Sequence, residues 1–348
     1  MKLPSGVYIK GYKDVNVILH TKTQWGLFLA LAIGLAIFPL VGPSFWASFI
    51  ILTSISLIVV FGLEILTGYC GQISLGQAAF MGVGAYGYAN LVTKLGIPFP
   101  IALIGGGLIA SAVGSIFGLA ALRVKGYYLA MTTLAAQFIL TYAFLHLHRF
   151  TYGFIGYSVP AIKIAGEPLS KIGYFYLIVG ITFILGLMAK NFRRTKWGRA
   201  FIAVRDNDLA AEAMGIDLPR TKLLAFAISC FYAGVAGGLW AAYIGMITPD
   251  HFTLMGSIYF LAMIVIGGIG TLSGAIFGTV FVKLLEEGVM WATPLISGLV
   301  GGVGHLDTIL SLVLFGAVIA AFLIFEPRGL DHLWNRFKNY YRLWPFPY

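Results

Sequence analysis

Long apolar stretches, each of about 20 residues, follow one another along most of this chain and constrain its fold more than any other feature. An apolar helix of about 20 residues is long enough to cross the hydrocarbon core of a bilayer. The composition agrees, because 59% of the 348 residues are hydrophobic and only 10% are charged, whereas soluble domains carry about 25% charged residues. We therefore predict an all-α integral membrane protein built as one helical bundle.

Ten segments have the length and hydropathy of membrane spans. They are Trp25–Val41, Phe45–Leu66, Ser74–Val92, Ile101–Leu122, Gly126–Leu147, Gly173–Ala189, Leu223–Ile247, Met255–Ile269, Leu272–Trp291 and Thr308–Phe325. Four glycines between Gly267 and Gly274 break the helical pattern where the eighth and ninth segments meet. A re-entrant hairpin there, which would reduce the count to eight or nine, is an open alternative to ten spans.

The positions of the basic residues predict the orientation. Four Lys and Arg residues lie before Trp25, eight within 190–222 and four after Glu326, which makes 16 of the 23 in the chain. Because basic residues are enriched in cytoplasmic segments, we predict a cytoplasmic N-terminal tail (1–24), a transmembrane domain (25–325) with a cytoplasmic loop (190–222), and a cytoplasmic C-terminal tail (326–348). The net charge of +10 then reflects topology and contact with membrane lipid, and no motif supports nucleic-acid binding.

Three smaller features concern processing, redox state and chemistry. The first apolar run lacks a small-residue cleavage site, which favours a retained span over a removed signal peptide. Cys70 and Cys230 lie in apolar segments, so we expect two unbonded packing residues. His146 and His148 lack a third ligand in the sequence pattern, and we predict neither a metal site nor a catalytic centre.

The loop 190–222 is the one long polar stretch with a helical pattern. After the helical run WGRAFIAV, the side chains of Asp206, Asn207 and Asp208 can cap a second helix of about two turns, which Gly215 and Pro219 would end. Isolated helices this short are unstable in water. The loop is therefore either a solvated connection or a coupling helix that docks on a cytoplasmic protein. The coupling hypothesis assigns Arg205, Asp206, Asn207, Asp208, Ala210, Glu212, Ala213, Met214 and Gly215, with Ala210, Ala213 and Met214 on the docking face.

The stretch GYCGQISLGQAAFMGVGAYGYA, residues 68–89, places polar and small residues in an apolar region. The side chains of Gln72, Ser74 and Gln77 need hydrogen-bond partners at membrane depth, and the glycines around them predict an interrupted helix. Such breaks lie beside substrate pathways in transporters, although interhelical hydrogen bonding explains the same residues equally well. Glu64 is a further pathway candidate as an ionisable group near a span, but a position at the cytoplasmic interface is the favoured alternative.

The same stretch also contains a stripe of small side chains. At helical spacing, Ser74, Ala78, Gly82, Ala85 and Ala89 share one face. Because water does not drive helices together within a bilayer, close approach over small residues is a common means of association. We predict that Ala78, Gly82, Ala85 and Ala89 pack against another helix.

Several blocks of this sequence resemble the membrane permeases of branched-chain amino acid ABC importers. The blocks are GYCGQISLGQAAFMGVGAY, WGRAFIAVRDNDLAAEAMGIDLPRTKLLAF, PDHF, VIGGIGTLSGAIFG and FEPRGL, and they occur in the family's order between about residues 62 and 330. Glu64 departs from the family, which usually carries an uncharged polar residue there. The exterior segment Leu147–Ile172 matches the family only partly.

The resemblance implies a type II ABC importer permease with ten helices and a coupling helix, in the inner membrane of a bacterium or archaeon. Its implied partners are a second permease subunit, two cytoplasmic ABC ATPases and an external solute-binding protein, which segment 147–172 would help to receive. The sequence contains no GK dipeptide and hence no Walker A loop. We therefore expect this chain to bind no cofactor and the ATPases to use ATP and Mg.

Three functions compete at this point. The leading hypothesis is a permease subunit for branched-chain or other hydrophobic amino acids, and a related importer of urea or short amides is the alternative within transport. A stand-alone secondary transporter or channel is a third possibility. That class predicts ionisable residues deep in several spans, and apart from Glu64 the spans contain almost none.

Overall fold

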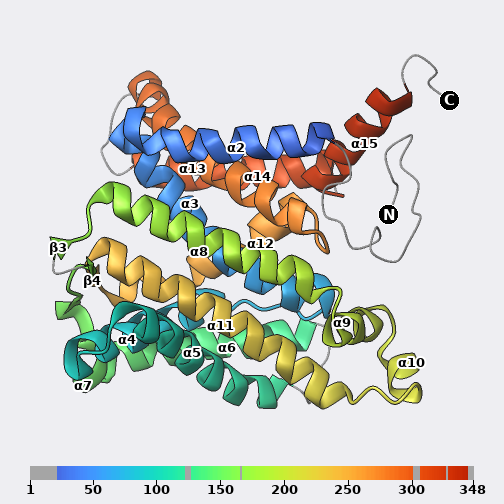
Figure 1. Ribbon diagram of the computed structural model, residues 1–348, viewed down its shortest axis with the longest axis horizontal. Helices are drawn as coiled ribbons and strands as arrows, with labels where there is room; N and C mark the ends of the chain where they lie inside the picture. Colours follow the sequence, from blue (N-terminus) through green and yellow to red (C-terminus); the bar gives the residue numbers. More distant parts are fainter. Residues whose placement is uncertain (1–21, 122–126, 165–166, 301–305, 327, 344–348) are drawn as a thin grey trace.

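The computed structural model describes residues 22–121, 127–164, 167–300, 306–326 and 328–343, and most of these are helical. The predicted tails 1–24 and 326–348 lie partly outside the described residues. The described part is a helical bundle whose long helices run roughly parallel to one another (Figure 1). The described part of the protein is therefore all-α in its architecture, and its strands are two residues long.

A helix occupies each of the ten segments predicted as spans. These helices are α2 (Lys22–Val41), α3 (Ser44–Leu63), α4 (Gln77–Leu95), α5 (Phe99–Ala121), α6 (Tyr127–His146), α8 (Lys171–Phe192), α11 (Leu218–Ile244), α12 (Leu254–Gly267), α13 (Leu272–Val300) and α14 (Leu306–Phe325). Among the described residues, six stretches are both long and apolar enough to cross a membrane. They are 44–69, 99–119, 128–146, 171–192, 218–244 and 249–267.

The structure differs from the predicted boundaries at two places. The second segment continues from α3 into a π-helix, η1 (Glu64–Tyr69), and the third helix begins at Gln77 rather than Ser74. The eighth and ninth segments are two separate helices, α12 and α13, joined through Gly268 and Gly270, whose φ angles of 110° and 96° suit glycine. These glycines form a tight connection between two helices, an arrangement that both two spans and a re-entrant hairpin would have.

Short elements gather at the two ends of the bundle. One end carries α7 (His148–Thr151), η2 (Gly153–Ile155), β1 (Tyr157–Ser158), β2 (Lys163–Ile164), β3 (Glu167–Pro168), β4 (Met246–Ile247) and η3 (Pro249–Phe252). Strands β1 and β4 pair antiparallel, as do β2 and β3. The opposite end carries α9 (Lys196–Asp206), α10 (Asp208–Ala213) and α15 (Leu330–Leu343), as Figure 1 shows.

Helices α4, α5 and α11 form the centre of the bundle, and glycine makes their contact possible. A Cβ atom on Gly84 of α4 would overlap the backbone of Gly234 of α11, and one on Gly106 of α5 would lie 2.8 Å from the carbonyl oxygen of Gly84. A Cβ on Gly237 would overlap the carbonyl of Met81. The three helices therefore touch backbone to backbone, which maximises dispersion contacts where no water is available to drive packing.

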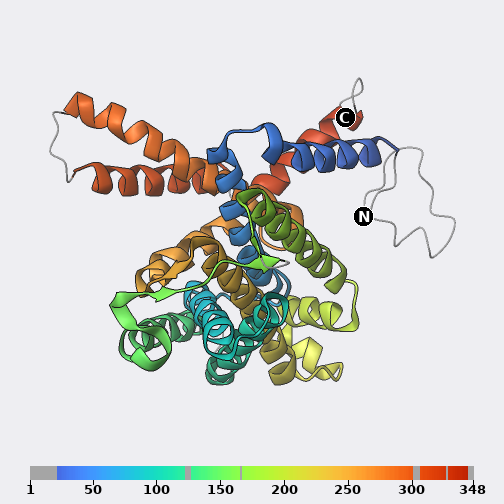
Figure 2. The same ribbon diagram turned by 60° about the vertical axis from the view of Figure 1, so that its left-hand side comes forward.

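The remaining helices surround this centre unequally. Helix α3 packs against α11 and α8, and most of its side chains are buried. Figure 2 shows α2 and the α13–α14 pair extending away from the bundle that contains α4, α5, α8 and α11. The centre is thus closely packed, while both of these extensions leave much helix surface uncovered by the described residues.

We predict that Gly84→Ala lowers the stability of the protein strongly, because the added methyl group would have to separate α4 from α11. Overpacking of this kind costs about 1–3 kcal/mol. Gly180→Ala in α8 is the matched control, since no atom lies within 4 Å of its Cβ position and alanine favours a helix by about 0.5–1 kcal/mol. Thermal unfolding in detergent should show a lower midpoint for Gly84→Ala alone. Equal midpoints for the two variants would contradict the backbone contact.

Candidate functional site

The chain is unwound between η1 and α4, inside the bundle. Helical structure ends at Tyr69 and resumes at Gln77, and Gly71 in the break has a φ of 72°. The break is tied to the end of η1 at Gln72, whose backbone N–H donates to the carbonyl of Leu66 at 3.1 Å and whose carbonyl accepts from Thr67 Oγ1 at 2.9 Å. The interruption predicted from the glycines is therefore a defined turn.

The first backbone amides of α4 are satisfied by side chains of other helices. A helix start leaves several N–H groups without partners in the helix. Here Thr133 Oγ1 of α6 accepts from the amide of Leu75 at 2.9 Å, Ser257 Oγ of α12 accepts from that of Ala78 at 2.9 Å, and Gln137 Oε1 of α6 accepts from that of Ala79 at 3.0 Å. These bonds hold the start of α4 between α6 and α12.

Gln137 connects most of this polar network. Its Oε1 also accepts from Ser257 Oγ at 3.0 Å, and its Nε2 donates to the carbonyl of Phe252 at 2.7 Å. Gln137 is 1% exposed and Ser257 is fully buried. The amide therefore joins α4, α6, α12 and η3 at one buried point.

Gln77 joins α4 to α11. Its Nε2 donates to Ser229 Oγ at 2.9 Å and to the Ser229 carbonyl at 3.2 Å. Its Oε1 is buried and has no hydrogen-bond partner among the described residues. Ser74, also fully buried, accepts from the amide of Gly76 at 3.4 Å. Gln77 thus joins α4 to α11 through its Nε2, while its Oε1 can still accept a hydrogen bond.

Glu64 is completely buried at the start of η1. The sequence placed Glu64 either beside a pathway or at the cytoplasmic interface, and both positions stay predictions. Gly68 makes room for the carboxylate, since a Cβ there would overlap it. The carboxylate lies near the backbone of Gly270 and the charge of Arg205, but neither oxygen has a hydrogen bond of ordinary geometry with the described residues.

Arg205, at the end of α9, bridges the loop element and the bundle. Its guanidinium donates from Nη1 to the carbonyl of Gly68 at 2.6 Å, which satisfies an acceptor near the end of η1. Two glycines make room for it: a Cβ on Gly71 would lie 2.9 Å from Arg205 Cγ, and one on Gly270 would lie 3.1 Å from Nη1. One side chain therefore contacts η1, the helix break and the α12–α13 connection.

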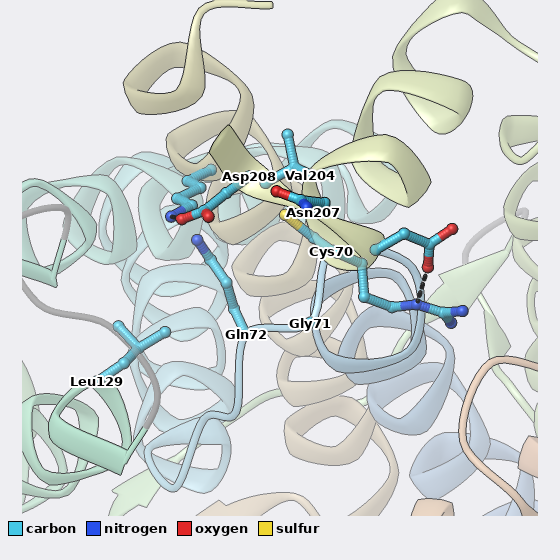
Figure 3. A pocket seen from close by; sticks show the side chains of 10 residues that line it. Cys70, Gly71, Gln72, Leu129, Val204, Asn207 and Asp208 are labelled. Carbon is cyan, nitrogen blue, oxygen red and sulfur yellow. Dashed lines mark hydrogen bonds and ion pairs between the residues drawn. The ribbon is translucent and has the colours of Figure 1, made fainter. Parts of the chain in front are cut away.

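A cavity of about 360 Å³ lies beside this bridge (Figure 3). It is lined by Cys70, Gly71, Gln72, Leu129, Val204, Arg205, Asp206, Asn207, Asp208 and Lys222. Lys222 Nζ lies 3.8 Å from Asp208 Oδ2, and Figure 3 shows the Gln72 side chain directed toward Asp208. Gln72 therefore faces the α9–α10 element and not the central network of Gln77.

Helix α10 has the capped start and glycine end that the sequence predicted. Asn207 Oδ1 accepts from the amide of Ala210 at 3.1 Å, and Gly215 has a φ of 84°. Asp206 belongs to α9 and pairs with Arg205 at 3.3 Å. Pro219 stands at the start of α11.

One face of α10 is uncovered by the described residues. Ala211 is buried against the bundle, whereas Leu209 is 69% and Met214 is 84% exposed. Ala210, Glu212, Ala213 and Gly215 are exposed as well. The helix therefore displays an apolar surface, to which Leu209 adds a side chain that the sequence analysis did not assign.

The predicted small-residue stripe is buried, and one of its residues, Ala85, lies at the closest contact of α4. Ala78, Gly82, Ala85 and Ala89 are all buried. A side chain on Gly82 would meet the rings of Phe144 and Phe252. The backbone crossing with α11 lies at Gly84, on the neighbouring face, and also at Ala85, whose amide nitrogen would be 2.9 Å from a Cβ on Gly237.

The sequence analysis missed four polar residues of this site: Thr133, Gln137, Ser229 and Ser257. Each belongs to a predicted span. The criterion that selected Gln77, an amide inside an apolar segment, applies equally to Gln137. The two histidines singled out earlier lie elsewhere, and His146 stacks on Tyr142 with a ring separation of 3.9 Å.

The long apolar helices and the buried polar break define a polytopic membrane permease. The chain belongs to the family described as branched-chain amino acid transport system permease component, whose model matches residues 45–324. No solved structure matches the chain.

Three relatives illustrate the range of this family. The high-affinity branched-chain amino acid transport system permease protein LivM of Escherichia coli (strain K12) is 29% identical over 304 residues, which cover 80% of this chain and 68% of that protein. The probable branched-chain amino acid transport permease protein LivH of Methanocaldococcus jannaschii is 28% identical, covering 76% and 84%. The autoinducer 2 import system permease protein LsrC of an Enterobacter species (strain 638) is 32% identical over 40% of this chain and 44% of that protein.

We predict that Gln137→Leu destabilises the protein, because it removes the acceptor of the Ala79 amide and the donor to Phe252. Each buried polar group left without a partner costs about 1–3 kcal/mol. Thr132→Val is the control on the same helix, because Thr132 is half-buried and its hydroxyl donates only to the carbonyl of Tyr128 within α6. The unfolding midpoint should fall for Gln137→Leu and stay unchanged for Thr132→Val. An unchanged midpoint in both would show that the network does not hold α4.

Proposed function

We propose that this chain is one permease subunit of an ATP-driven ABC importer for branched-chain or other hydrophobic amino acids. The family match over residues 45–324 and the branched-chain amino acid transport named for LivM and LivH support the substrate class. The single observation that supports coupling to a separate ATPase is the capped, exposed helix α10. In this proposal the protein has no enzymatic activity of its own, and two cytoplasmic ATPase subunits use ATP and Mg.

The proposal includes ten spans with both termini and the 190–222 loop in the cytoplasm. The ten helices at the predicted segments support this count, and the basic residues support the orientation. Elements α9, α10 and α15 then face the cytoplasm (Figure 1). Elements α7 and β1–β4 face outward, where the exposed side chains of Phe154 and Ile155 offer apolar surface to a solute-binding protein.

In this mechanism α10 docks on an ATPase and Arg205 transmits its movement. The apolar face of Leu209, Ala213 and Met214 is suited to a groove on a partner. A displacement of α10 shifts the end of α9, and the bond from Arg205 to the Gly68 carbonyl passes that shift to η1 and the helix break. Because residues 71–76 of the break lie outside helical structure, the break can change its conformation without unwinding α3 or α4.

The pathway residues in this proposal are Gln72, Ser74, Gln77 and Glu64. Gln77 retains an unused acceptor, and Glu64 retains a carboxylate without ordinary hydrogen bonds. Buried polar groups of this kind are costly, and a rearranged state that gives them partners would recover that cost. A second permease subunit would complete the passage, since the sides of α5 and α6 expose apolar residues such as Leu108 and Phe138.

The direct test is uptake into proteoliposomes that contain the chain with a second permease, ATPases and a binding protein. We expect ATP-dependent uptake of leucine, isoleucine or valine, and uptake of urea alone would support the alternative substrate.

In the same system Ala213→Asp should abolish uptake while leaving expression and folding unchanged, because Ala213 is exposed. Asn191→Asp, which adds the same charge to an exposed residue of α8, is the control. Normal uptake with Ala213→Asp would refute docking through α10.

The orientation can be tested by labelling in intact cells. Single cysteines at Thr195 and Asn339, both exposed, should react with an impermeant thiol reagent only after lysis, whereas one at exposed Glu167 should react from outside. The background is free of Cys70 and Cys230, which are unbonded and buried. Labelling of Thr195 or Asn339 from outside would overturn the proposed topology.

A further inference from the structure

Helix α15 carries an apolar face that the other described residues cover only in part. Trp334 is 51%, Phe337 is 64% and Tyr340 is 61% exposed, and these residues recur every third position along the helix. Arg336 and Lys338 are also exposed. At 3.6 residues per turn they fall on the two borders of the aromatic face. No acidic residue follows Asp331 in the sequence.

The start of α15 is fixed to the bundle. Asp331 is 9% exposed, and its carboxylate accepts from Ser273 Oγ of α13 at 2.5 Å and from Asn335 Nδ2 at 3.0 Å. Gly329, with a φ of 79°, packs on Gly268, where a side chain would meet the Gly268 backbone at 2.6 Å. The helix therefore occupies a defined place beside the start of α13 and is not a loose tail.

An apolar groove of about 720 Å³ runs between α13 and α15. Its walls are Ile276, Phe277, Val280, Phe281 and Leu284 of α13, and Leu330, Leu333, Trp334 and Phe337 of α15. The ring centroids of Phe277 and Trp334 lie 5.8 Å apart. Among the described residues that line the groove none is charged, so its occupant is apolar along the groove's length.

We propose that this groove binds an acyl chain of an anionic phospholipid whose headgroup is held by Arg336 and Lys338. Two observations favour lipid over a protein occupant. The α13 wall continues along a helix predicted to span the membrane, so the groove opens toward hydrocarbon, which a soluble ATPase does not reach. The cations on both borders of the aromatic face match an anionic headgroup, while Trp334 and Tyr340 are of the type enriched at membrane interfaces.

This proposal is independent of the transport function and is tested on the purified full-length chain in lipid vesicles. The probe is phosphatidylglycerol with brominated acyl chains, which quenches nearby tryptophan, and brominated phosphatidylcholine is the neutral comparison. The contribution of Trp334 is the difference between the wild-type protein and Trp334→Phe. We expect Trp334 to be quenched at a lower fraction of phosphatidylglycerol than of phosphatidylcholine, by about ten-fold or more, since each basic residue contributes about five-fold near an anionic surface.

The double variant Arg336→Gln/Lys338→Gln should remove this preference and leave quenching by both lipids equal. Lys196→Gln/Arg199→Gln, which removes two exposed charges from α9, should retain it. Equal quenching of wild-type Trp334 by both lipids would overturn the headgroup assignment. Absence of quenching by either lipid would overturn lipid binding, and loss of quenching when a second permease subunit is added would assign the groove to a protein interface instead.

Discussion

The demand that every buried backbone N–H group find a partner governs this structure more than any other interaction. Just before α4 the chain leaves helical geometry inside the bundle, where no bulk water can bond the backbone N–H groups that lack helical partners. Thr133, Gln137 and Ser257 supply the missing acceptors from helices that are far away in the sequence. The break exists only because α6 and α12 are in place, and it fixes their positions in return.

Glycine provides the second condition for this arrangement. The crossing of Gly84 with Gly234 and the contact of Gly106 with the Gly84 carbonyl bring α4, α5 and α11 together without side chains between them. Glycines at 71 and 270 have a different use, because they leave space for Arg205. Small residues therefore form the centre of the bundle and also leave space for the guanidinium of Arg205, which reaches the bundle from the loop.

The sequence predicted where the helices lie along the chain, but it did not predict which helices contact one another. Apolar length located ten helices, and cap chemistry located α10 with Asn207 and Gly215 at its ends. Spacing also predicted a small-residue stripe, but it could not say which face meets which helix, so the crossing at Gly84 was not found. The burial of Glu64 could not be predicted, because the position of a residue along a predicted span does not show that α9 and the α12–α13 connection cover it. Gln137 could have been found from its residue type, but its bond to Ala79 depends on tertiary contacts.

The composition of α4 has a consequence for biogenesis. This helix is not among the six described stretches that are apolar enough to cross a membrane by themselves, and its closest partner, α11, begins at Leu218, more than 100 residues later in the chain. A nascent chain that has released α4 but not yet α11 exposes Gln77 and a glycine-rich face to lipid. The insertion machinery must therefore retain α4, or let it enter the bilayer together with later helices, until the seventh long helix has been synthesised.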